Sequence, residues 1–175
     1  MVAIGYGRGE LWPCSDLDVL LLHAPRRSID DLADRIWYPI WDLGLKLGHS
    51  VGTPGQALAL AKEELERATA FLDLRLIGGD PGLLASFEAG RDKLWQSRLS
   101  DLMNRLSAAV ELRHSTQGDV AFRLEPDLKE GRGGLRDLHA LSWAERGDPG
   151  FAHDLLVELA PEAELLSTVR VELHR

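Results

Sequence analysis

The sequence has a single cysteine, few aromatic residues and no long apolar run. Cys14 alone cannot form an internal disulfide, which fits a protein of the reducing cytoplasm. No apolar stretch approaches the roughly 20 residues that a transmembrane helix needs. The first residues, Met-Val-Ala-Ile-Gly, have no basic region followed by a long apolar segment, so they predict no signal peptide. The sequence thus predicts a cytoplasmic protein with no membrane partner.

Basic residues are also fewer than acidic residues. The chain has 20 Lys and Arg against 28 Asp and Glu, a net charge of −8. Sequence-independent binding to DNA or RNA needs Lys and Arg to displace counterions from phosphates. The charge therefore argues against a nucleic-acid partner and favours a small nucleotide and a protein partner. With 175 residues, 45% of them hydrophobic, the chain is expected to form one globular domain or two small ones.

The stretch from Val2 to Leu22 combines an apolar lead-in, a glycine-rich turn, Ser-Asp-x-Asp and a second apolar run. This order predicts a strand, a turn and an acidic strand over Leu17 to Leu22. Side chains alternate along a strand, so Asp16 and Asp18 are expected on one face. An Asp-x-Asp pair alone is more often a solvated strand edge. The whole combination favours a Mg²⁺ site, because proteins hold Mg²⁺ through one or two carboxylates plus substrate phosphates, and glycines let backbone N–H groups approach a triphosphate.

Three segments carry a resemblance to a known family: Gly5 to Leu22, Trp41 to Val51 and Leu124 to His139. The first resembles the signature of DNA polymerase β-type nucleotidyltransferases, a glycine turn followed by Asp-x-Asp on the next strand. All three are similar to the N-terminal region of the GlnD family, bifunctional uridylyltransferase/uridylyl-removing enzymes of the nitrogen-signalling protein PII. The resemblance covers nearly the whole chain. It implies an α+β fold in which a small mixed sheet with flanking helices is followed by a helical domain.

The resemblance also implies an activity: Mg²⁺-dependent transfer of UMP from UTP to a tyrosine of a PII protein, with release of pyrophosphate. Asp16 and Asp18 would be the catalytic metal ligands. Contacts to the phosphates or to the PII tyrosine would come from the first turn and from a second glycine-rich stretch, through Gly7, Arg8, Gly9, Ser15, Lys129 and Arg136. Ser15 is equally compatible with capping the strand.

Two alternatives to this activity stay open. One is the same transfer with ATP as donor, because the motifs do not show whether the site binds uracil or adenine. The other is a truncated module that binds nucleotide or PII without catalysis. It is suggested by Gly52, where the family usually has arginine, and by family segments that the sequence lacks, among them the phosphohydrolase and ACT domains. The chain is therefore expected to be either a fragment or a reduced relative, of unknown oligomeric state.

The superfamily normally uses a third carboxylate, which the sequence does not identify. The strand expected over Leu45 to Val51 contains no acid. Three candidates remain: Asp73, Glu125 and Asp127. His49, in the middle of that strand, is interpreted first as a structural histidine, with a place near the triphosphate as the alternative.

Capping signals and apolar spacing predict the remaining elements. Ser28 and Asp31 are expected to cap a helix, and Pro39 is expected to kink it or to end its first part. Trp37 and Trp41 of this helix are expected in the core rather than as a base-stacking platform. A single helix is expected from Thr53-Pro54 to about Ile77, stopped by Gly78-Gly79. Further helices are expected from Asp80-Pro81, over Leu94 to His114, over Phe151 to Ala160 and over Pro161 to His174.

The second glycine-rich stretch, Asp127 to Asp137, is expected to open a helix. Free N–H groups and the positive end of the helix dipole would make it an anion site. The change in pattern along the chain predicts a nucleotidyltransferase core over residues 1–95 and a helical domain over residues 96–175.

Overall fold

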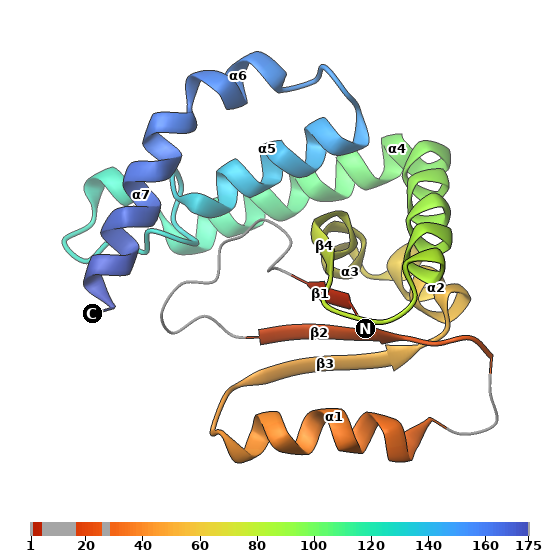
Figure 1. The fold of residues 1–175 in the computed structure, drawn as a ribbon. Coiled ribbons are helices and arrows are strands. Elements are labelled where there is room, and N and C mark those ends of the chain that lie inside the picture. Colours follow the sequence, from red (N-terminus) through yellow and green to blue (C-terminus); the bar gives the residue numbers. More distant parts are fainter. Residues whose placement is uncertain (1, 5–16, 26–28, 175) are drawn as a thin grey trace. The chain divides into compact units, whose positions relative to one another are not determined.

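The computed structural model describes residues 2–4, 17–25 and 29–174. The chain divides into two compact units, Met1–Leu94 and Trp95–Arg175. The first contains β1 (Val2–Ile4), β2 (Leu17–Leu22), α1 (Asp30–Asp42), β3 (Leu47–Gly52), α2 (Pro54–Glu63), α3 (Leu65–Ala70), the 3₁₀ turn η2 (Phe71–Asp73) and β4 (Leu74–Leu76) (Figure 1). Helix α4 (Pro81–Gln117) begins in the first unit, and η3 (Val120–Phe122), α5 (Leu135–Gly147), α6 (His153–Glu158) and α7 (Ala160–Leu173) follow. The predicted α+β class is confirmed.

The four strands form one mixed sheet in the order β3-β2-β1-β4. Strand β2 runs parallel to β3, while β1 is antiparallel to both β2 and β4. The register places Asp18 beside Gly48 on one side and beside Ile4 on the other, and Ile4 in turn lies beside Leu74. The predicted strand over Leu17 to Leu22 is therefore confirmed. The strand expected over Leu45 to Val51 is its neighbour β3, which begins two residues later and ends one residue later than predicted.

The core of the first unit is built on β2. Its last four residues, Val19 to Leu22, are all buried, as expected for an apolar strand inside a sheet. Val19 and Leu21 pack against Trp37 of α1, which covers one face of the sheet (Figure 1). The core prediction is confirmed for Trp37 but wrong for Trp41, which is 39% exposed.

Helix α1 begins at Asp30, one residue later than a cap at Ser28 predicts, and continues past Pro39. It begins after Ile29, which makes no side-chain cap hydrogen bond, and the predicted cap Ser28 lies outside the described residues. The helix does not end at Pro39 but continues to Asp42. A proline this close to the C-terminus removes one hydrogen bond of the last turns, so the helix tolerates it.

Helix α2 begins as predicted and ends earlier. Thr53 forms a capping box: its Oγ1 accepts from the N–H of Gln56 at 3.3 Å, and its own N–H donates to Gln56 Oε1 at 2.9 Å. The backbone leaves the helical region at Glu64, with φ −108° and ψ 113°. The expectation of one helix to Ile77 is wrong, because α3, η2 and β4 follow instead. Residues Leu74–Leu76 form β4, which pairs with β1 on the side opposite β2.

Beyond the sheet the chain is mainly helical. The two helices expected from Asp80-Pro81 and over Leu94 to His114 are present as two helical segments of α4, which meet at a kink at Arg98 (φ −126°, ψ 22°). Helices α6 and α7 confirm the last two predicted helices: α6 is shorter at both ends, and α7 is shifted by one residue toward the N-terminus. Within the described part of the chain, no helix is both long and apolar enough to cross a bilayer.

Candidate functional site

Asp18 is the predicted metal ligand whose position the structure gives. It is the second residue of β2, and its side chain is exposed, whereas the four residues that follow are buried. On the neighbouring strand its partner is Gly48. A Cβ built on Gly48 would collide with Asp18 Oδ1. The carboxylate of Asp18 therefore lies over the backbone of β3, in space that a side chain at position 48 would fill.

The other predicted residues of the first turn lie outside the described part of the chain. These are Gly7, Arg8, Gly9, Ser15 and Asp16. Their contacts, and a shared face for Asp16 and Asp18, stay predictions. Among residues 2–4, 17–25 and 29–174 there is no group of three His, Cys, Asp or Glu side chains that is placed to hold a metal ion.

The three candidates for the third carboxylate occupy different environments. Asp73 is 2% exposed and directly precedes β4, in the same unit as Asp18. Its neighbour Leu74 lies in the row of paired residues that includes Ile4 and Asp18. Arg91 Nη1 donates to the carbonyl of Phe71 at 2.9 Å and so fixes the turn that ends at Asp73.

Glu125 and Asp127 belong to the second unit. Glu125 is exposed. Asp127 Oδ1 accepts from the backbone N–H groups of Lys129 and Glu130, both at 2.9 Å. This carboxylate caps the turn at the start of the glycine-rich stretch, which is a structural role.

The glycine-rich stretch forms a closed loop rather than the predicted open anion site. The N–H groups of Leu135 and Arg136 donate to the carbonyls of Leu128 and Lys129, both at 2.9 Å. The closed loop requires glycine at two positions, because a Cβ on Gly131 or Gly134 would come within 2.7 Å of a backbone carbonyl oxygen. The expectation of free N–H groups at the start of α5 is thus wrong, because the loop's own carbonyls already accept from them.

The two predicted cations of this loop face the same acid. Arg136 Nη2 lies 3.0 Å from Glu130 Oε1, and Lys129 Nζ lies 3.9 Å from the same oxygen. The guanidinium carbon of Arg136 is also 5.8 Å from the ring centre of Trp143. Lys129 is exposed and Arg136 is half-buried. Their contact with phosphate or with the PII tyrosine stays a prediction.

Asp137 connects the end of α4 to the start of α5. Arg113 Nη2 donates to Asp137 Oδ1, His114 Nε2 lies 2.8 Å from the same oxygen, and the N–H of Gly133 donates to Oδ2 at 2.7 Å. Arg113 Nη1 also donates to the carbonyl of Glu130 at 2.9 Å. Burial acts to raise the pKa of Asp137, but the hydrogen bonds from Arg113, Gly133 and His114 outweigh it and lower the pKa. Sequence reasoning did not find this cluster.

We expect Asp137→Asn to lower the free energy of unfolding by about 1.5–3 kcal/mol at pH 7, the usual worth of a hydrogen bond to a charged group. Because the pKa of Asp137 is lowered by folding, its stabilisation is fully present above the unfolded pKa of about 3.9. The stabilisation is lost as the pH falls through the folded pKa. Urea unfolding of both proteins at pH 7 and pH 3 should show the difference between them shrinking in acid. A difference that is the same at both pH values would contradict this role.

His49 is exposed and its ring contacts aromatic side chains of α1, while the preferred interpretation, a hydrogen-bonded structural histidine, stays a prediction. Its ring centre lies 5.3 Å from those of Trp37 and Trp41. Trp41 in turn makes an edge contact with Tyr38 at 5.5 Å. Strand β3 therefore presents His49 to the aromatic side chains of α1, while Gly48 is paired with Asp18.

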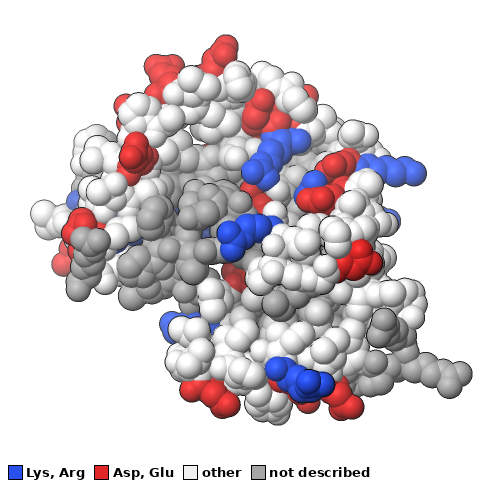
Figure 2. Space-filling model, viewed as in Figure 1, with Lys and Arg blue, Asp and Glu red and all other residues white. Residues whose placement is uncertain are grey.

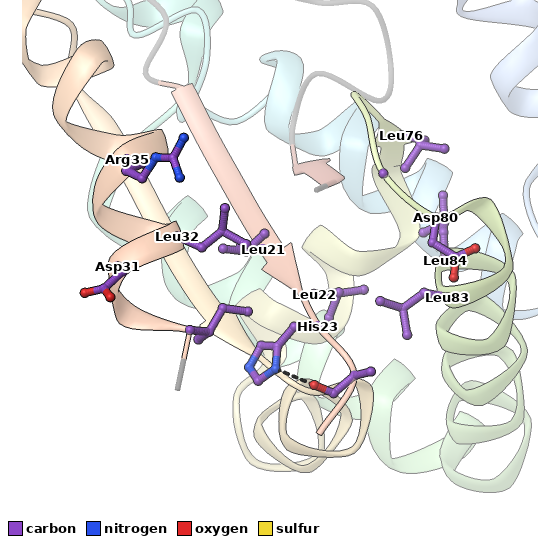
Figure 3. A pocket seen from close by; sticks show the side chains of 13 residues that line it. Leu21, Leu22, His23, Asp31, Leu32, Arg35, Leu76, Asp80, Leu83 and Leu84 are labelled. Carbon is purple, nitrogen blue, oxygen red and sulfur yellow. Dashed lines mark hydrogen bonds between the residues drawn. The ribbon is translucent and has the colours of Figure 1, made fainter. Parts of the chain in front are cut away.

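A pocket of about 540 Å³ lies at the other end of β2. Leucines from β2, α1 and α4 line it, together with the polar residues His23, Asp31, Arg35 and Asp80 (Figure 3). His23 Nδ1 is 2.8 Å from the carbonyl oxygen of its neighbour Ala24. Asp18 is not among the residues that line the pocket, and the nearest lining residue of β2, Leu21, is three residues away, about 10 Å along an extended strand. This pocket is therefore separate from the predicted metal site.

Charged side chains are dispersed on the face that Figure 2 shows. Lys and Arg side chains are interspersed with Asp and Glu and do not gather into a stripe. A basic stripe is the usual electrostatic footprint of a nucleic-acid-binding surface. The coloured residues of this face thus show no such footprint.

Comparison with known proteins gives the family. The sequence model of the GlnD PII-uridylyltransferase family matches residues 101–147. The chain is 49% identical over 144 residues to the bifunctional uridylyltransferase/uridylyl-removing enzyme of Streptomyces coelicolor, an alignment that covers 81% of this chain and 17% of that enzyme. It is 42% identical over 179 residues to the Mycobacterium tuberculosis enzyme of the same name, covering 98% and 22%. The chain belongs to the GlnD family.

A third GlnD relative, from Ralstonia nicotianae, is 37% identical over 193 residues, covering 99% of this chain and 22% of the enzyme. The chain thus spans about a fifth of the length of the curated relatives it matches. The segment matched by the GlnD family model contains the whole Asp137 cluster and the closed loop before α5. These are features of the second unit, whereas Asp18 belongs to the first.

Proposed function

We propose that the chain is the nucleotidyltransferase region of a PII uridylyltransferase, which transfers UMP from UTP to a tyrosine of a PII protein. The observation that carries the proposal is the identity of 37–49% to enzymes named bifunctional uridylyltransferase/uridylyl-removing enzyme over 81–99% of this chain. The exposed Asp18 on the central part of the sheet supports it. A cytoplasmic location is part of the same proposal, in keeping with a single cysteine.

In this proposal Asp16 and Asp18 hold Mg²⁺. The surroundings of Asp18 fit a hard cation: its carboxylate is exposed, stands at the start of a strand and lies over Gly48, which has no side chain. When bound, Mg²⁺ supplies a clamp for the triphosphate and neutralises charge that develops on its oxygens. The tyrosine oxygen forms a bond to the α-phosphorus, the bond to the bridging oxygen breaks, and pyrophosphate leaves.

The remaining residues bind and orient the substrates. Gly7, Arg8, Gly9 and Ser15 would contact the triphosphate, in keeping with the glycine turn of the resemblance. Lys129 and Arg136 would contact phosphate or the PII tyrosine after exchanging their present partner, Glu130. Transfer of this kind needs mainly positioning and electrostatic stabilisation from the protein.

For the third carboxylate we propose Asp73. It belongs to the sheet-bearing unit, is buried, and directly precedes the row of residues that leads through Ile4 to Asp18. Asp127 is engaged in capping its own loop. Asp73 would act as a metal ligand or as the base that accepts the tyrosine proton.

The proposal for Asp73 predicts unequal effects of two matched substitutions. Asp73→Asn should lower the rate of transfer by about 100-fold, the usual cost in rate of removing one electrostatic interaction with the transition state. Asp127→Asn keeps an oxygen acceptor for the loop and should leave the rate within about twofold. Urea unfolding of each variant checks that the fold is retained. Equal rates for the two variants would contradict the assignment of Asp73.

The activity itself is tested by incubating the chain with a PII protein, Mg²⁺ and either UTP or ATP. Release of pyrophosphate and a mass increase of one nucleoside monophosphate on a PII tyrosine are expected with UTP. The same products with ATP alone would name adenylyl transfer instead. Binding of nucleotide or PII without either product would favour a non-catalytic module.

A further inference from the structure

Gly48 is a glycine in the interior of a strand, where glycine is unfavourable. Its φ lies outside the left-handed range, so the backbone conformation does not require glycine. Relative to alanine, glycine costs about 0.5–1 kcal/mol in a strand because it loses more conformational freedom on folding. The backbone conformation and strand propensity therefore do not account for this glycine.

The neighbours of Gly48 give a steric reason for the glycine. A Cβ at this position would collide with Asp18 Oδ1 and would lie 3.4 Å from Asp18 Cγ. The third nearest atom, the carbonyl oxygen of Leu17, is at 3.7 Å, which is an ordinary contact. The steric conflict is thus with the carboxylate of Asp18 rather than with the backbone.

We infer that Gly48 is a positioning residue for Asp18: the missing side chain lets the carboxylate lie over β3. Adjacent strands are about 4.7–4.9 Å apart, so a methyl group at position 48 would occupy the same space as this carboxylate. Asp18 would have to adopt another rotamer, directed away from β3. The effect of this rotamer on metal binding rests on the proposed function, whereas the contact itself does not.

The same strand offers a matched control. Gly52 also lies in β3, paired with Leu22 at the end remote from Asp18. A Cβ there would lie 3.6 Å from Gln56 Oε1 and 3.7 Å from Gln56 Cβ, both ordinary contacts. Gly52→Ala therefore makes the same change of strand propensity without displacing Asp18.

The contact is tested by a double-mutant cycle on urea unfolding of the 175-residue chain, without metal or nucleotide. Gly48→Ala is expected to change the equilibrium constant for folding about threefold less favourably in the wild-type background than in an Asp18→Ala background, because Asp18 must leave its rotamer. In an Asp18→Ala background it should leave that constant unchanged or raise it. Gly52→Ala should have the same small effect in both backgrounds. An effect of Gly48→Ala that does not depend on Asp18 would overturn the inference.

A second measurement addresses metal binding. Calorimetric titration of Mg²⁺ with UTP should show at least tenfold weaker binding to the Gly48→Ala chain than to the wild type. Equal affinity of the two proteins would overturn the positioning role. If the wild-type chain binds no nucleotide while the cycle shows coupling, the contact is supported and the proposed function is contradicted for this chain, so the two failures are distinguishable.

Discussion

Replacing Asp18 by asparagine is expected to lower Mg²⁺-dependent pyrophosphate release by about 100-fold or more. A metal ion that stabilises transition-state charge is worth several kcal/mol, and each 1.36 kcal/mol is a factor of ten in rate. Asparagine keeps the size of the side chain but removes its negative charge, so the fold should be retained. The exposure of Asp18 supports this expectation, because a surface carboxylate contributes little to the core.

The matched control for this prediction is Asp34→Asn. Asp34 is an exposed aspartate of α1 and is not among the residues of that helix that pack against β2. The same loss of one negative charge at Asp34 should leave the rate within about twofold. Initial rates with UTP at saturating Mg²⁺ measure both variants. A rate for Asp18→Asn equal to that of Asp34→Asn would remove Asp18 from the metal site.

Phe87→Ala is expected to have the largest effect on stability, a loss of about 3–5 kcal/mol in the free energy of unfolding. Phe87 is fully buried, at 0% exposure, and its ring meets that of Phe71 edge to face at 5.2 Å. Truncation would remove this aromatic contact and leave a cavity beneath the turn that ends at Asp73. Urea unfolding at constant pH measures the loss.

The same substitution at an exposed phenylalanine provides the control. Phe122, in η3, is 88% exposed, so Phe122→Ala should change the unfolding free energy by less than about 0.5 kcal/mol. The comparison separates the effect of burial on stability from the effect of replacing a phenylalanine by alanine. A loss below about 1 kcal/mol for Phe87→Ala would show that this part of the core is not packed as described.

Sequence reasoning succeeded where a local signal determined the structure. The apolar run after Asp18 predicted β2 because four successive buried residues suit a strand inside a sheet. Thr53 followed by Pro54 predicted the start of α2, since the cap is formed by residues within one turn. The family resemblance, carried by three segments, agrees with the comparisons.

It failed where tertiary contacts decided. Strand β4 has only three residues, and its leucines fit a helix as well as a strand. These residues form a strand because their backbone pairs with β1. The amides before α5 looked free because sequence does not show that the carbonyls of Leu128 and Lys129 turn back to them. The pairing of Gly48 with Asp18 likewise depends on the register of β2 and β3.

Calorimetric titration of UTP into the chain, with and without Mg²⁺, tests the central claim most directly. We expect binding that requires Mg²⁺, is at least tenfold tighter for UTP than for ATP, and is lost in Asp18→Asn. Equal binding with and without Mg²⁺, or binding that Asp18→Asn leaves unchanged, would contradict a metal–nucleotide site at the start of β2.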